Sequence, residues 1–126
     1  MILLDTQQWI WLNDGNPRLL LSVPSMIAAE GGGISAVSVW EMTLLVEKGR
    51  LKTDLSPEMK IRDMLSRYPL KVIPLDLEIA LLSRTLPFEH EDPADRFIAA
   101  TAHRLGIPLA TSDARLTALP WLKTID

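Results

Sequence analysis

The sequence contains no cysteine and only two histidines, His90 and His103. The lack of cysteine excludes disulfides and thiolate metal sites, and it fits a reducing cytoplasm. Two histidines disfavour a zinc centre built from several imidazoles. No apolar run approaches the roughly 20 residues of a membrane span, and the N-terminus lacks a basic leader. We therefore expect a soluble, cytoplasmic protein without a membrane partner.

An excess of positive charge is also missing, because the net charge is −3 and the pI is near 5.3. Nucleic-acid-binding proteins usually carry a basic footprint, and this balance does not indicate one. It does not exclude one, since an acidic metal centre concentrates negative charge while nearby arginine and lysine hold phosphates. The chain has 126 residues, 48% hydrophobic and 23% charged, which is typical of one folded domain over residues 1–126.

Short apolar segments alternate with segments of helical spacing. Strands are predicted at residues 1–5, 34–37, 71–75 and 109–111, with residues 121–125 as a candidate fifth. Helical patterns occupy residues 9–12, 24–30, 38–48, 57–67, 77–86 and 92–105, and the glycines at 31–33 are expected to terminate the second of them. Pro74 indicates that the third strand ends there or lies at an edge. The alternation predicts an α/β fold, a three-layer α/β/α sandwich around a mostly parallel sheet of four to five strands.

Four carboxylates fall where such a fold gathers side chains at one edge. Asp5 ends the first apolar run and Asp113 follows the fourth, while Glu41 and Asp95 each fall in the first turn of a predicted helix. Parallel sheets bind ligands outside the carboxyl ends of their strands. Clustered carboxylates repel one another unless a cation lies between them, and hard divalent metals prefer oxygen ligands. The pattern predicts metal-assisted hydrolysis of a phosphate ester.

Helix capping is an alternative explanation for each acid. Asp5 and Asp113 are each placed to cap a following helix, and Ser38 with Glu41 has the spacing of a capping box. For Glu41 alone, capping is the favoured role. Capping does not explain why every acid stands at a strand end or near a helix start, which is what the metal site explains.

The segment from His90 to Arg96 contains two acids three residues apart. Asp92 is expected to be the N-cap of the helix that begins at Pro93, which leaves Asp95 one turn into the helix and free to face the other acids. Arg96 is expected either to contact a carboxylate or phosphate or to form a surface salt bridge.

Four segments of the chain match a known family. They are Leu4-Asp5-Thr6, residues 34–41 (ISAVSVWE), residues 90–102 (HEDPADRFIAATA) and residues 109–113 (LATSD). In their order and spacing, which covers essentially the whole chain, the sequence resembles PIN-domain ribonucleases, specifically the VapC-type toxins of type II toxin–antitoxin systems.

The resemblance implies an acidic site made of Asp5, Glu41, Asp95 and Asp113. It also implies Mg2+ or Mn2+ as the cofactor, endoribonuclease activity, a homodimer, and neutralisation by a cognate VapB-type antitoxin. Asp92 matches a recurrent family residue with a more structural role. Close relatives often carry histidine where this chain has Gln7, which puts any substrate role of that position in doubt. The tryptophans and leucines within residues 9–21 and 40–45 are compatible with a hydrophobic groove for an antitoxin peptide that inserts a basic residue into the acidic site.

The predicted reaction is metal-dependent hydrolysis of an RNA phosphodiester. Asp5 is the favoured direct metal ligand, with Asp95 or Asp113 beside it, and the remaining acids bind a second metal or orient water. Candidate helpers that orient water or phosphate are Thr6, Ser38, Arg96 and Thr111.

Two alternatives come from other classes of protein. A phosphate-accepting receiver-like domain has a similar length and architecture, but Asp5 has no acidic neighbour and Lys123 is poorly placed for that chemistry. A catalytically silent PIN-fold module would keep the fold for protein binding, and the presence of all four acids argues against it.

Overall fold

A computed structural model describes residues 1–125, so that residue 126, the last of the predicted domain, lies outside the described residues. Its centre is a five-stranded sheet in the order β3-β2-β1-β4-β5, and every pair of neighbouring strands is parallel. The strands are β1 (Ile2–Leu4), β2 (Gly32–Ser35), β3 (Lys71–Ile73), β4 (Leu109–Ala110) and β5 (Thr124–Ile125). The predicted α/β fold with a parallel sheet of up to five strands is confirmed.

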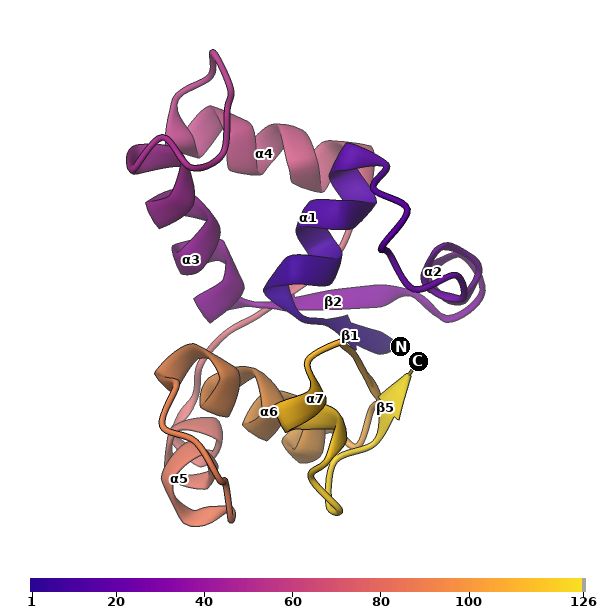
Figure 1. Cartoon of the computed structure of the whole chain (residues 1–126), viewed down its shortest axis with the longest axis vertical. Helices are drawn as coiled ribbons and strands as arrows, with labels where there is room; N and C mark the ends of the chain where they lie inside the picture. The colour runs from indigo at the N-terminus through magenta and orange to yellow at the C-terminus, as the bar shows by residue number, and fades with distance from the viewer. Residues whose placement is uncertain (126) are drawn as a thin grey trace.

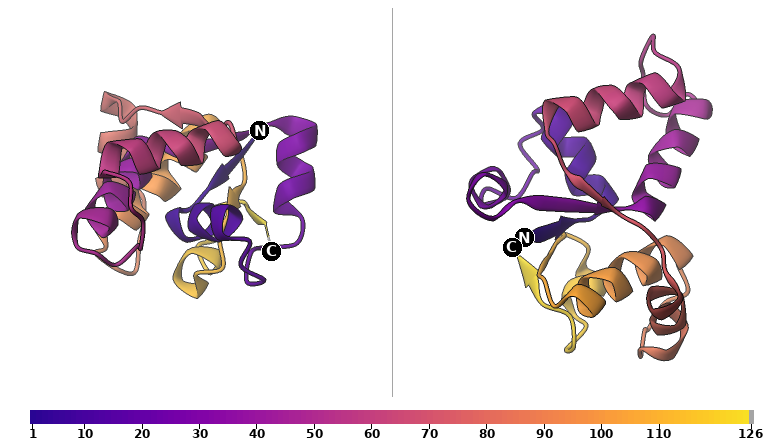
Figure 2. Two further views of the ribbon diagram at one scale, coloured as in Figure 1. Left: turned by 90° about the horizontal axis from the view of Figure 1, so that it is seen from above. Right: turned by 180° about the vertical axis from the view of Figure 1, so that it is seen from behind.

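Seven helices surround the sheet: α1 (Thr6–Asp14), α2 (Val23–Glu30), α3 (Ala36–Glu47), α4 (Pro57–Arg67), α5 (Leu77–Thr85), α6 (Pro93–Leu105) and α7 (Ala114–Thr117). Helices α1, α3 and α4 lie above the strands in Figure 1, whereas α5, α6 and α7 lie below them. The view from behind in Figure 2 shows the same separation. Among residues 1–125, no helix combines the length and the apolar character needed to cross a membrane.

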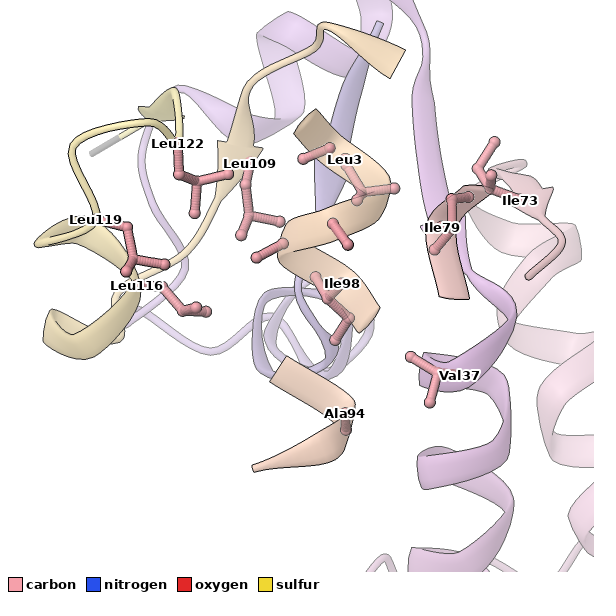
Figure 3. Packing of buried hydrophobic residues seen from close by; sticks show 13 residues of the cluster. Leu3, Val37, Ile73, Ile79, Ala94, Ile98, Leu109, Leu116, Leu119 and Leu122 are labelled. Atoms are coloured by element: carbon pink, nitrogen blue, oxygen red, sulfur yellow. The ribbon is translucent and has the colours of Figure 1, made fainter. Parts of the chain in front are cut away.

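The core consists of two apolar clusters, one on each face of the sheet. Along β1, Leu3 faces one cluster while Ile2 and Leu4 face the other, as the two-residue period of a strand requires. The Leu3 cluster joins β1 and β4 to α5, α6 and α7, and Figure 3 shows its side chains around Ile98. Because β1 is covered on both faces, its three residues are apolar and fully buried. Asp5, which follows this strand, is therefore held rigidly.

The boundaries of β2 and α3 differ from the prediction. Only Gly31 ends α2, with φ +84°, while Gly32 and Gly33 belong to β2. A Cβ at Gly32 would lie 2.7 Å from the Leu70 side chain, so close packing explains glycine in this strand. The strand then stops at Ser35, whose hydroxyl accepts from the Val37 amide and caps α3.

This early start of α3 overturns the capping box predicted for Ser38 and Glu41. Ser38 is a buried residue inside the helix and Glu41 lies in its second turn, too far from the N-terminus to cap it. At the other side of the sheet, β3 ends at Ile73, two residues earlier than predicted. The expectation from Pro74 is confirmed, because the strand stops before this proline and lies at an edge of the sheet.

Candidate active site

The four predicted acids meet at the carboxyl edge of the sheet. Asp5 follows β1 directly, Asp113 follows β4, Asp95 lies in the first turn of α6, and Glu41 lies in the second turn of α3. All four side chains line one cleft with a volume of about 500 Å³. Asp5 and Asp113 also cap the helices that follow them. Capping a helix and lining the cleft are therefore compatible roles for one carboxylate.

Asp5 is the most buried of these acids, with 7% of its surface exposed. Its Oδ1 accepts from the Gln8 amide at 2.8 Å, and the Thr111 hydroxyl nearby lowers the pKa of the carboxyl. Burial raises the pKa of Asp5, these two groups oppose that rise, and the charges of Asp95 and Asp113 add to it. Asp5 is thus a rigid carboxylate that gains from a nearby positive charge.

Glu41 is oriented by the Thr6 hydroxyl, which in turn contacts the Ser38 hydroxyl. The Thr6 hydroxyl donates to Glu41 Oε1 at 2.5 Å and lies 2.8 Å from the hydroxyl of Ser38, which is fully buried. Burial raises the pKa of the Glu41 carboxyl, the Thr6 hydrogen bond lowers it, and the charges of Asp92, Asp95 and Asp5 raise it further. The side chain of Glu41 is therefore fixed in orientation.

Asp95 stands between a histidine and an arginine. Its Oδ2 lies 3.2 Å from His90 Nε2 and 3.3 Å from Arg115 Nη2. Burial and the charge of Asp92 raise the pKa of Asp95, while the His90 hydrogen bond opposes them. Asp92 itself caps α6 by accepting from the Asp95 amide at 3.1 Å, as the sequence predicts.

Asp113 differs from the other three acids, because Arg115 neutralises it. The guanidinium of Arg115 lies 3.0 Å from Asp113 Oδ2, and its hydrogen bonds to that carboxylate hold the pKa of Asp113 below its usual value. Sequence reasoning missed Arg115. Its only signal is a position two residues after a capping aspartate, which does not show that the side chain also reaches Asp95, 20 residues earlier.

The structure brings three of the four predicted helpers to the acids and leaves the fourth outside the cleft. Thr6, Ser38 and Thr111 contact acids or one another, as described above. Arg96 is instead a buried residue of α6, whose Nε donates to the Ser83 carbonyl at 2.7 Å and whose Nη1 donates to the His90 carbonyl at 3.2 Å. The predicted contact with a carboxylate is also present, because Nη1 lies 3.5 Å from the exposed Glu91, which does not line the cleft. The Arg96 guanidinium also lies 4.5 Å from the centre of the Phe88 ring. Arg96 therefore fixes the segment between α5 and α6.

Apolar side chains also line the cleft. They are Ile10, Trp11 and Leu45, contributed by α1 and α3. A second residue that sequence reasoning missed, Gln8, is fully buried and also lines the cleft. Its amide nitrogen donates to Ser112 Oγ at 2.9 Å, and its Oε1 accepts from the Leu20 amide.

The donor set fits a hard divalent cation in its chemistry. Four carboxylates supply oxygen ligands, and burial raises the pKa values of Asp5, Glu41 and Asp95, so that a nearby cation would favour their charged forms. Within the described residues, no three acidic or histidine side chains are already arranged around one point. Between Asp95 and Asp113, the positive charge is supplied by Arg115.

Comparison with known families gives a match over almost the whole chain. The model of the PIN domain matches residues 2–122. The chain belongs to the PIN-domain family. PIN domains are generally nucleases, and such nucleases generally use divalent metal ions. The predicted family is confirmed, and the receiver-like alternative loses its basis. No curated protein sequence matches the chain.

Solved structures share this fold over their full length. The chain is 21% identical to one in VapBC2 from Rickettsia felis bound to a promoter DNA fragment, with a TM-score of 0.78 and coverage of 99% of this chain and 98% of that one. The chain is 20% identical to one in VapBC from Salmonella typhimurium bound to DNA, with a TM-score of 0.72 and coverage of 99% of this chain and 96% of that one. It is 25% identical to one in FitAcB from Neisseria gonorrhoeae, with a TM-score of 0.66 and coverage of 100% of this chain and 97% of that one.

Proposed function

We propose that this PIN-domain protein is a VapC-type toxin, a ribonuclease that hydrolyses RNA phosphodiester bonds with Mg2+ or Mn2+. The observation that carries the proposal is the meeting of Asp5, Glu41, Asp95 and Asp113, from four separate elements, in one cleft. The fold neighbours, which are described as VapBC or FitAcB, support the toxin assignment.

Asp5 and Asp95 are the residues that would hold the cation, with Asp113 beside them. A bound divalent ion supplies a nucleophile from water at neutral pH and stabilises the charge that develops on the phosphate. The chain contributes preorganisation, because the Gln8 amide fixes the Asp5 carboxylate before substrate arrives.

Glu41 is suited to orient the attacking water. Its raised pKa makes it a better proton acceptor than an ordinary glutamate, and the Thr6 hydroxyl fixes one of its oxygens. The Ser38 hydroxyl lies 2.8 Å from the Thr6 hydroxyl and helps to hold it in place. In this arrangement Glu41 orients the attacking water, while Asp5 and Asp95 would bind the cation.

The mixed lining of the cleft suits an antitoxin peptide. The acids attract a basic side chain, and Ile10, Trp11 and Leu45 add apolar surface to the same cleft. A peptide of the cognate VapB-type antitoxin with an apolar face and a basic tip would contact both kinds of side chain. Such binding would block access of RNA to the acids.

We also propose that the protein is a cytoplasmic homodimer. Its candidate interface surrounds a second, mainly apolar cavity of about 490 Å³, whose lining includes Trp40, Leu75 and Phe97. Trp40 is 60% exposed, and Leu77 on the neighbouring helix α5 is also exposed. Exposed apolar side chains of this size mark surfaces that bind protein partners.

RNA cleavage in the presence of Mg2+ or Mn2+ tests the proposed function. The protein should cleave RNA, chelation should stop the reaction, and Asp5→Asn should strongly reduce it. Asp54→Asn, at an exposed aspartate that does not line the cleft, is the matched control and should cleave normally. Equal cleavage by the wild type and Asp5→Asn would contradict the proposed site. The absence of cleavage of any RNA would favour the silent protein-binding module.

A further inference from the structure

Arg115 is the cation that connects Asp95 and Asp113. Its Nη2 lies 3.0 Å from Asp113 Oδ2 and 3.3 Å from Asp95 Oδ2, and its Nε lies 3.3 Å from Asp113 Oδ1. The backbone amide of Arg115 also donates to Asp113 Oδ1, at 2.9 Å. Both oxygens of Asp113 therefore contact the same arginine, and Asp113 has no oxygen that is free of it.

The hold of these acids on Arg115 is weak enough to be broken. Its side chain is 56% exposed, and it extends from α7, a helix of four residues. Exposed ion pairs contribute little, because water screens them and because ordering a long side chain costs entropy. The side chain of Arg96, in contrast, is 7% exposed, and it donates to two backbone carbonyls as well as lying 3.5 Å from Glu91 Oε1. Arg115 can leave its position without opening the core, and Arg96 cannot.

We propose that Arg115 is a displaceable counter-ion of the acidic site, in competition with the divalent cation for Asp95 and Asp113. The inference rests on the metal dependence proposed above. A divalent ion bound to these carboxylates would be repelled by the guanidinium held against the same oxygens, so the two positive charges compete and binding of the ion favours a guanidinium that has turned away. Arg115 then keeps the outer acids neutralised until the ion binds, and it lowers the apparent affinity for that ion.

Titration with Mn2+ in the absence of RNA tests this competition. Calorimetry on the wild type and Arg115→Gln should show tighter binding by the variant, by about two- to tenfold, which corresponds to the loss of a weak ion pair. Arg115→Lys keeps the charge but loses the forked contact, so its affinity should fall between the two. Arg67→Gln removes an exposed ion pair with Asp63 on α4 and should bind Mn2+ as the wild type does.

The Nε–Hε resonance of Arg115, assigned by its absence in Arg115→Gln, gives a second measurement. In the wild type it should shift during a Mg2+ titration over the same concentrations at which Mg2+ binds. Unchanged or weaker Mn2+ binding by Arg115→Gln, or a resonance that does not move while the ion binds, would overturn the competition alone. A lack of binding by both proteins would overturn the metal centre and the competition together.

Discussion

The inner and outer halves of the acidic site control carboxylate charge in different ways. In the inner half, Asp5 is buried and Glu41 is partly buried, each accepts a hydrogen bond, and burial raises their pKa values. In the outer half, Asp113 is neutralised by Arg115, and its pKa is lowered. Within residues 1–125 the inner carboxylates thus have no cationic partner, whereas Asp113 already has one.

Substitution of the most buried acid has the largest expected effect on activity. Asp5→Asn should reduce RNA cleavage by about 100-fold or more, because it removes the favoured metal ligand. Asparagine is a good N-cap, so α1 and the fold should be retained. Asp113→Asn should reduce cleavage less, since Arg115 already contacts both oxygens of Asp113. Initial rates at saturating Mg2+ measure the difference, and a larger loss for Asp113→Asn would break the comparison of the two halves.

The two arginines sharpen the same contrast between burial and exposure. Arg96→Ala should lower the free energy of unfolding by about 2–4 kcal/mol, because it leaves the Ser83 and His90 carbonyls without a donor and removes packing on Phe88. Arg115→Ala should leave the stability near that of the wild type. Urea denaturation measures both variants, and similar losses of stability would contradict the assignment of Arg115 to a weakly held position.

Removal of one hydroxyl group tests the support of Glu41. Thr6→Val should reduce cleavage by about 10-fold, because Glu41 loses the donor that fixes its orientation. Thr6→Ser keeps that hydroxyl and is the matched control. Steady-state rates should show the loss mainly in kcat, and equal rates for the valine and serine variants would show that Thr6 has no such role.

The smallest expected effect is the pH dependence of stability without divalent ions. A raised pKa means that the folded protein holds the proton more tightly than the unfolded chain, so Asp5, Glu41 and Asp95 stabilise the fold fully only below their ordinary values of 3.8 and 4.5. That contribution is lost as pH rises through the raised pKa values of the folded protein. Asp113, whose pKa is lowered, acts oppositely and loses its contribution as pH falls below 3.8.

Unfolding in a chelating buffer should therefore become harder as pH falls from neutrality towards the ordinary carboxyl values. Asp5→Asn should weaken this dependence and raise stability at neutral pH, because it removes a buried charge that lacks a counter-ion. Urea denaturation at several pH values measures the slope. An identical slope for the wild type and Asp5→Asn would contradict the assigned protonation of Asp5.

Elements with local causes were predicted well from the sequence. Asp92 caps α6 and Asp95 follows in its first turn, because both positions depend on backbone amides three residues away. The start of α3 was predicted wrongly. The capping box was placed at Ser38, whereas β2 pairs with β3 up to Ser35 and the helix begins directly after that residue.

The sequence by itself determined the alternation of strands and helices, the family, and the four acids that the fold gathers, because strand ends and caps are set by neighbouring residues. Only the tertiary structure decided which charges those acids meet. Arg96 and Arg115 both follow shortly after an aspartate in the sequence, yet one turns into the protein towards Ser83 and the other crosses the cleft to Asp95. Long flexible side chains find partners that lie 13 and 20 residues away, and chain packing, not local sequence, brings those partners within reach.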